Sequence, residues 1–438
     1  MRIAFTTLGC KLNQVETNVM QEACRGSLME VVPFEAEADV YVVNTCSVTG
    51  KTDRAARQLV RRAVAQNPQA AVVVTGCYAQ LQPEAVSALP GVRLVLGNEE
   101  KHDLLHYLGS LEVNGAGTRI AVGEIGRSAA FRSAPLREFV GYTKAFVKIQ
   151  TGCDYRCTFC SIWTARGPSR SETPERILAQ MAELARSGVR EMAFTGVCVG
   201  SYGLDLAPST TLAALVRRAE AVEGLERLRI TSIEPTELTD ELLETMATSP
   251  IVCPHLHVPL QSGSDRVLEA MDRNYHAAFY RGRVEAAARL MPGAGIGADV
   301  MVGFPGETDD DFETTAALLE ALPVTYLHVF SFSARPGAPA AERPDQVDLE
   351  VKKARSKRLR DLGEAKRRAF MAAQVGRTVP VLIETTRDRT TGRLKGWSDT
   401  YVKVHLEGPN AWMGRVMPVD VTAQVDGHLE GVGVGQGA

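Results

Sequence analysis

Three cysteines lie close together in the stretch QTGCDYRCTFCSIW (150–163), where Cys153, Cys157 and Cys160 follow the spacing CxxxCxxC. Three thiolates this close can hold three corners of a cubane iron–sulfur cluster and leave the fourth iron open to a cofactor or substrate. Zinc is the competing metal, but a structural zinc site needs a fourth ligand. No histidine occurs between His106 and His255, so no nearby imidazole supplies it. The spacing therefore favours an iron–sulfur cluster over zinc.

Three further cysteines stand alone, each directly after an apolar run: Cys10 in TLGC, Cys46 in VVNTC and Cys77 in VVTGC. In a parallel sheet the carboxyl ends of the strands share one edge, and ligands bind there in open α/β folds. We therefore expect these three thiols to converge on one site. Cys24 falls inside a helical pattern instead and is interpreted as a core thiol.

The first 112 residues contain the elements that must position these lone cysteines. Apolar, β-branched runs at 2–9, 39–46, 70–77 and 92–97 alternate with helical stretches. Continuous apolar strands alternating with helices predict a parallel sheet covered on both faces, here a Rossmann-like α/β domain over 1–112. Residues 113–142 are interpreted as a linker.

A second series of strands and helices is predicted over 143–373. Strand-like runs fall at 145–150, 190–195, 228–233, 255–260, 296–302 and 325–330. Six βα units are too few for a closed eight-fold barrel and predict a partial (βα)6 barrel. A basic helix is expected over roughly 348–373. Residues 374–432 alternate apolar and polar side chains, which predicts a small antiparallel β-barrel.

Charge is unevenly distributed along the 438 residues, whose net charge is −3. Between Glu350 and Lys403 there are 15 lysines and arginines against 6 acidic residues. This concentration favours an acidic partner, with nucleic acid as the first candidate, although a solvated helix face would account for about half of it. Trp397, Tyr401 and Trp412 lie in or near the same segment and are either stacking faces for RNA or, for at least two of them, barrel core.

No run of eighteen apolar residues occurs, so we expect no membrane span. The N-terminus reaches polar residues too early for a signal peptide, and we expect a cytoplasmic protein. In that compartment the nine cysteines do not form a disulfide framework.

The CxxxCxxC motif, with Phe159 before its last cysteine and directly after the first predicted barrel strand, resembles the radical S-adenosylmethionine (SAM) superfamily. In that superfamily SAM chelates the open iron, and an electron from the cluster cleaves it to a 5′-deoxyadenosyl radical. The whole chain resembles the radical SAM methylthiotransferases, whose members have such an N-terminal domain, the barrel and a C-terminal RNA-binding β-barrel called TRAM.

The resemblance implies two 4Fe–4S clusters and SAM as cofactors. Cys153, Cys157 and Cys160 would hold the SAM-binding cluster. An auxiliary cluster, which carries the sulfur to be inserted, would be held by Cys10, Cys46 and Cys77. The implied partners are a tRNA anticodon stem-loop and a flavodoxin- or ferredoxin-like reductant protein, with the enzyme acting as a monomer.

Several stretches resemble the threonylcarbamoyladenosine branch of this family: TLGCKLNQVET (7–17), GYTKAFVKIQTGC (141–153), ARGPSRS (165–171) and TGVCVGSYGLDL (195–206). The resemblance implies methylthiolation at C2 of N6-threonylcarbamoyladenosine at position 37, next to the anticodon. Lys11-Leu12-Asn13 follows the first cysteine where the ribosomal-protein branch has Pro-Lys-Asn and the isopentenyladenosine branch has Gln-Met-Asn. These two substrates remain alternatives, as does a non-catalytic iron–sulfur protein that binds RNA or senses redox state.

Other candidate site residues lie in loops after the barrel strands, where active-site residues collect. The stretches TSIEPTE (231–237), HVPLQSGSD (257–265) and ADVMVGFPGET (298–308) are such loops. The residues expected to contact SAM are Gly196, Glu234, Gln261, Ser262 and Asp299. Roles in loop structure or helix capping are the alternative.

Cys198, His255 and His257 are not among the residues expected to contact SAM. Cys198 stands where relatives commonly carry Asn and is either a chance thiol or an extra reactive group near the cluster. His255 and His257 share one strand face and are expected to pack or to form hydrogen bonds rather than bind iron.

Overall fold

The N-terminal part of the chain forms a six-stranded, entirely parallel sheet in the order β2-β1-β3-β4-β5-β6. The computed structural model describes residues 1–111, 117–127, 131–134, 136 and 142–434. The strands are β1 (Arg2–Thr7), β2 (Glu30–Val32), β3 (Val40–Thr45), β4 (Ala71–Gly76), β5 (Val92–Leu96) and β6 (Arg119–Ala121). Every residue of β3 and β4 is buried. The predicted parallel sheet is confirmed.

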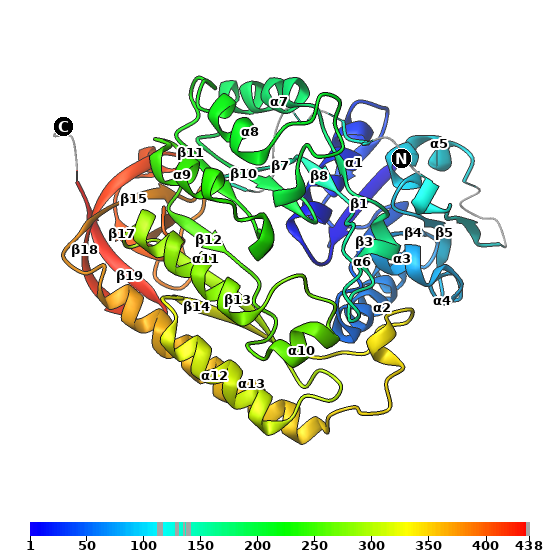
Figure 1. Cartoon of the computed structure of the whole chain (residues 1–438). Helices are drawn as coiled ribbons and strands as arrows, with labels where there is room; N and C mark the ends of the chain where they lie inside the picture. Colours follow the sequence, from blue (N-terminus) through cyan, green and yellow to red (C-terminus); the bar gives the residue numbers. More distant parts are fainter. Residues whose placement is uncertain (112–116, 128–130, 135, 137–141, 435–438) are drawn as a thin grey trace.

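Helices cover both faces of this sheet (Figure 1): α1 (Lys11–Arg25), α2 (Gly50–Gln66), α3 (Cys77–Leu81), α4 (Pro83–Ser87) and α5 (Leu104–Gly109). Successive side chains of a strand point to opposite faces. Val42 accordingly joins the core cluster that contains Met20 of α1, and Val43 joins the one that contains Val60 of α2. Cys24 is fully buried in the first of these clusters, as expected of a core thiol.

The segment 113–142, interpreted as a linker, lies partly outside the described residues. Its strand β6 pairs in parallel with β5, so this part belongs to the N-terminal sheet and corrects that interpretation. Thr118 Oγ1 donates to Val92 O at 2.8 Å beside it. A three-residue strand of mixed polarity is too short to stand out by periodicity.

Six parallel strands then form the predicted partial barrel. β7 (Ala145–Lys148), β10 (Glu191–Thr195) and β11 (Arg227–Ile230) make one three-stranded sheet, and β12 (His255–His257), β13 (Gly295–Val302) and β14 (Tyr326–Ser331) make the other. A parallel bridge between Leu228 and Val252 links β11 to the segment before β12. The outer helices are α7 (Pro174–Arg186), α8 (Leu212–Ala219), α9 (Asp240–Thr248), α11 (Ala277–Leu290) and α12 (Asp309–Ala321).

The interior of this barrel is polar. Ile230, Leu256 and Ala298 belong to the core cluster that also contains helix residues, so they face outward from the barrel toward the helices. Their neighbours alternate to the inside, where Arg229 Nε donates to Glu191 at 2.7 Å. The barrel interior therefore presents charged and hydrogen-bonding groups rather than a second apolar core.

The C-terminal part is a closed five-stranded barrel in the order β15-β16-β17-β19-β18. Its strands are β15 (Thr378–Ile383), β16 (Leu394–Ser398), β17 (Lys403–Glu407), β18 (Val416–Val425) and β19 (His428–Gly433). β17 and β19 pair in parallel and the other pairs are antiparallel. The predicted small barrel is present, and Trp412 packs against its core cluster. In the described part of the chain this cluster includes one of the three aromatics, whereas the core alternative requires at least two.

The two barrels dock through hydrogen bonds from buried arginines of the first barrel to backbone carbonyls of the second. Arg229 Nη1 donates to Asp399 O at 2.7 Å and Arg227 Nη1 donates to Trp397 O at 3.2 Å. Both arginines pair with Glu191, which is fully buried. The long helix α13 (Leu349–Ala372) runs alongside β14 toward the C-terminal barrel (Figure 1). None of the helices in the described ranges is long and apolar enough to cross a membrane.

Candidate active site

The CxxxCxxC loop runs from β8 (Gln150–Thr151) to α6 (Ile162–Arg166) at the mouth of the partial barrel. Cys157 is buried, and Cys153 and Cys160 are half-buried. Gly152 before them has φ +76°, and a Cβ there would lie 1.8 Å from Pro168 O, so this position requires glycine. Thr158 anchors the middle of the loop, where its N–H donates to Met271 O at 3.1 Å.

Charged groups surround these thiols. Arg273 Nη1 donates to Cys157 Sγ at 3.2 Å, and the same guanidinium forms an ion pair with Glu234. Burial raises the pKa of the Cys157 thiol, and the positive charge of Arg273 opposes that rise. Since metals bind the thiolate, a cation at this distance supports metal binding. Arg273 was missed by the sequence analysis because no local motif marks it.

Cys198 lies directly beside this loop. Its thiol shares a hydrogen bond with Cys153, which lowers the pKa of the Cys153 thiol. Cys198 Sγ also contacts Glu237 Oε1 at 3.1 Å and is buried. Cys198 therefore lies near the cluster loop, and this position does not decide between a chance thiol and an extra reactive group.

The three lone cysteines occupy neighbouring strand ends of the N-terminal sheet. Cys10 directly precedes α1, Cys46 follows β3 and Cys77 begins α3 after β4, and β1, β3 and β4 are adjacent strands. A Cβ on Gly9 would lie 2.7 Å from Cys46 Sγ, so that thiol lies against the residue before Cys10. Burial, and then the neighbouring Cys77, raise the pKa of Cys46 to about 12. The three thiols thus share one edge, as the strand pattern indicated.

A buried charge cluster fixes the N-terminal domain against the barrel. Glu16 of α1 pairs with Lys101 at 2.6 Å, with Lys148 of β7 at 3.3 Å and with Arg166 of α6 at 2.9 Å. All four side chains are at most 3% exposed. Burial opposes ionisation of Glu16, but the three cations hold its pKa well below the usual range. Arg166 also donates to Asn13 Oδ1 at 2.7 Å, which ties this cluster to the first turn of α1, directly after Cys10.

A cleft of about 730 Å³, open solvent included, separates the N-terminal sheet from the barrel mouth. Its walls include Val48 and Thr49 after Cys46, and, from the barrel, Cys160, Gln261, Asp299 and Phe330. Arg335 closes one side through a buried ion pair with Asp53 at 2.5 Å.

Two of the five residues expected to contact SAM line this cleft, Gln261 and Asp299. Glu234 lies instead beside the CxxxCxxC loop in its ion pair with Arg273. Gly196 packs against Gln150, since a Cβ there would lie 2.7 Å from Gln150 Oε1.

Ser262 fits its expected role least well. Its side chain is fully buried, its hydroxyl lies 3.3 Å from Thr315 Oγ1, and it accepts a hydrogen bond from Ser264 N at 3.2 Å. Ser262 therefore has a role in loop structure, the alternative to SAM contact, because its hydroxyl forms hydrogen bonds within the fold and does not line the cleft.

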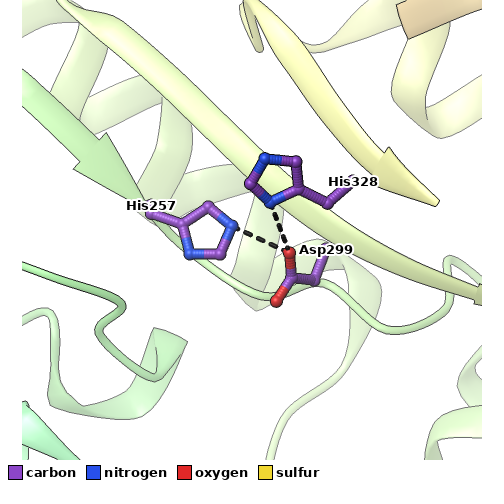
Figure 2. Close-up of side chains that lie close together, drawn as sticks. All are labelled: His257, Asp299 and His328. Carbon is purple, nitrogen blue, oxygen red and sulfur yellow. Dashed lines mark hydrogen bonds and ion pairs between the residues drawn. The ribbon is translucent and has the colours of Figure 1, made fainter. Parts of the chain in front are cut away.

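Asp299 accepts hydrogen bonds from two histidines on the neighbouring strands (Figure 2). His257 Nε2 lies 2.8 Å and His328 Nδ1 lies 3.1 Å from Asp299 Oδ1, and Ser232 Oγ pairs with His257 Nδ1. Burial raises the pKa of Asp299, but these hydrogen bonds bring it down to about 2. Two imidazoles and a carboxylate can also bind a divalent metal, but hydrogen bonds already satisfy these ligand atoms. His257 has the hydrogen-bonded role expected of it.

His328 was not singled out from sequence. It lies two residues after Tyr326 on β14, and residues two apart on a strand share a face. That alternation is the signal that could have found it.

Comparison with known proteins gives the chain its family. Residues 2–97 match the uncharacterized protein family UPF0004, and residues 147–319 match the radical SAM superfamily. The threonylcarbamoyladenosine tRNA methylthiotransferase MtaB of Bacillus subtilis (strain 168) is 36% identical over 426 residues, 96% of this chain and 93% of that protein. The chain belongs to the radical SAM methylthiotransferase family.

Relatives named for two different activities match this methylthiotransferase at similar levels of identity. Threonylcarbamoyladenosine tRNA methylthiotransferase MtaB of Aquifex aeolicus is 38% identical over 409 residues, 93% of this chain and 97% of that protein. The tRNA-2-methylthio-N(6)-dimethylallyladenosine synthase of Cereibacter sphaeroides is 35% identical over 438 residues, 99% of each chain. Identity alone therefore does not fix the modified nucleoside.

Among solved structures, the radical SAM methyltransferase TsrM of Kitasatospora setae matches this methylthiotransferase with a TM-score of 0.57 at 18% identity. The match covers 78% of this chain and 75% of that one. At this identity the likeness shows a shared fold.

As a radical SAM enzyme this methylthiotransferase uses SAM and a 4Fe–4S cluster. The residues at the barrel mouth fit such a cluster. One short loop carries three cysteines, two of them half-buried, and a guanidinium touches the third. Cys160, Gln261 and Asp299 line the adjoining cleft and offer polar atoms beside this loop.

Proposed function

We propose that this tRNA methylthiotransferase inserts a methylthio group at C2 of N6-threonylcarbamoyladenosine at position 37, next to the anticodon. The observation that carries the chemistry is the common cleft. The loop after Cys46 and the loop with Cys160 form walls of the same space, so two cysteine sets can serve one substrate atom. The choice of nucleoside is supported by the stretch TLGCKLN and by the activity for which the Bacillus and Aquifex relatives are named.

In this proposal Cys153, Cys157 and Cys160 hold the SAM-binding cluster, and an auxiliary 4Fe–4S cluster is held by Cys10, Cys46 and Cys77. When bound, these groups and SAM supply the electron, the radical, the methyl group and the sulfur. A flavodoxin- or ferredoxin-like protein supplies the reducing electrons.

The side chains around the cleft orient the cofactor. Asp299 offers a carboxylate oxygen to SAM hydroxyls, since no described residue donates a hydrogen bond to its Oδ2. Gln261 adds a side-chain amide to the same wall of the cleft. Arg273 keeps Cys157 in a form that binds iron, and Glu234 fixes the position of Arg273.

The anticodon stem-loop would bind across α13 and the C-terminal barrel. Arg360 and Arg368 on α13 and Arg389 and Arg415 on the barrel are exposed to solvent. Other cations of α13 pair with acidic neighbours, as Lys357 does with Asp361 at 2.6 Å, and these fit the solvated-face alternative. Phosphate contacts of the exposed arginines would make binding salt-dependent.

The test is a direct assay with anaerobically reconstituted protein, SAM and a reductant. Two anticodon stem-loop RNAs, identical except for threonylcarbamoyl- or isopentenyladenosine at position 37, are offered separately and digested for nucleoside mass spectrometry. We expect a methylthio product from the first RNA alone. Product from the isopentenyl RNA alone would assign the enzyme to the alternative substrate.

A further inference from the structure

Lys11 occupies the junction of all three parts of the chain. It is the first residue of α1 and directly follows Cys10. Helix α1 packs against β7, and the Lys11 ammonium lies 5.8 Å from the centre of the Phe146 ring of β7. The same ammonium lies 6.0 Å from the centre of the Tyr401 ring in the C-terminal barrel. Lys11 is thus the neighbour of a proposed cluster ligand, Cys10, and its side chain projects toward the barrel interior.

The surroundings of Lys11 are rich in positive charge. Lys144 lies over the same Tyr401 ring at 4.9 Å, and Arg229 lies over it at 5.1 Å. Both of these cations pair with Glu191, at 3.8 Å and 2.7 Å. Glu191 is therefore already shared among several cations.

Lys11 itself has no such partner. Among the residues that the structure describes, no carboxylate forms an ion pair with Lys11, and its ammonium lies near the two aromatic rings. Its side chain is accessible to solvent. A cation held between two ring faces with neighbouring cations and no anion of its own is suited to an anionic ligand.

We propose that the Lys11 ammonium binds the carboxylate of the threonyl group on the substrate adenosine and so determines substrate specificity. This inference rests on the proposed function. The adenine C2 must approach the sulfur held beside Cys10, so the substituent on N6 of the same ring lies within reach of the next residue. The threonylcarbamoyl group ends in a carboxylate, whereas an isopentenyl group carries no charge.

The isopentenyl group would also leave Lys11 without a partner after water is displaced. A site built to pair a polar group rejects analogues that lack it, because its own buried group is then left unpaired. One ammonium can therefore favour one nucleoside and disfavour the other.

The test compares wild type, Lys11→Gln and Lys11→Arg on two RNAs. One stem-loop carries threonylcarbamoyladenosine, and the other carries the same group with its carboxylate converted to a neutral amide. We expect Lys11→Gln to lower kcat/KM on the carboxylate RNA by about 10- to 100-fold, the range of a charge-assisted hydrogen bond. Lys11→Arg should recover most of this loss, because it keeps the charge.

On the amide RNA, wild type and Lys11→Gln should differ by less than about threefold, since the interaction is already absent. Arg25→Gln, at the exposed opposite end of α1, is the matched control and should behave as wild type on both RNAs. Iron content of each protein shows whether a substitution next to Cys10 disturbs the cluster.

Two results would overturn the inference: an equal loss for Lys11→Gln on both RNAs, or a wild type that uses the amide RNA as well as the carboxylate RNA. The second comparison uses wild-type protein only, so it decides the matter even where a variant loses iron. If wild type modifies neither threonylcarbamoyl RNA, the proposed substrate itself is wrong, which is a separate outcome.

Discussion

At the scale of single residues, Asp299 links the cleft to the barrel interior. Its pKa of about 2 keeps it ionised at neutral pH, and His257 and His328 hold one of its oxygens. We expect Asp299→Asn to weaken SAM binding by about tenfold, because an amide replaces a charged acceptor. Equilibrium dialysis of SAM with the reconstituted protein measures this change.

Asp310→Asn is the control for that measurement, since Asp310 is exposed in the first turn of α12. It should leave the dissociation constant of SAM unchanged. An Asp299→Asn protein that binds SAM as tightly as wild type would remove Asp299 from the proposed cofactor contacts.

At the scale of elements, the packing of α1 against the barrel depends on one buried carboxylate, that of Glu16. Glu16→Gln would leave Lys101, Lys148 and Arg166 buried without their counter-charge. Breaking a buried pair on one side costs about 3–5 kcal/mol, and we expect a loss of that size in the free energy of unfolding. Urea denaturation of the apoprotein at pH 7 measures it.

The matched control is Glu30→Gln, whose partner Arg2 lies 3.9 Å away on the exposed end of the sheet. Exposed pairs contribute less than about 1 kcal/mol. The pKa of Glu16 is held well below its usual value of 4.5, so its stabilisation is present above that pH and is lost as the pH falls. Equal losses for the two variants would show that the cluster does not hold α1.

The elements differ in how far sequence alone could predict them. The strands near 145–150 and 296–302 stood out because their residues are apolar, β-branched and bounded by loops. β16 reads LKGWS and has no such run, so its place in the barrel depends on partners it meets only after folding. The Glu16 cluster joins residues up to 150 positions apart, a distance that no local pattern bridges.

At the scale of the whole molecule, strand order determines where the lone cysteines meet. Cys10, Cys46 and Cys77 come together because β1, β3 and β4 are adjacent and parallel, and this followed from the alternation of strands and helices. The contact of Arg273 with Cys157 spans 116 positions and did not follow from any spacing. Sequence thus predicted the thiols of the candidate site better than the charges that surround them.

If each cysteine set holds its own cluster, loss of one set should remove half of the bound iron. After anaerobic reconstitution we expect about eight irons per wild-type chain and about four for either Cys10→Ala or Cys157→Ala, since each substitution removes one ligand of a 4Fe–4S cluster. Cys24→Ala is the control and should retain about eight, because that thiol is buried in the core of the N-terminal sheet. The Cys157→Ala protein should still bind tRNA but form no 5′-deoxyadenosine. Four or fewer irons per wild-type chain would contradict the proposal of an auxiliary cluster. Because Cys160 and the residues shortly after Cys46 line one cleft, a loss of four irons from each of the two variants is the result that would assign a separate cluster to each cysteine set.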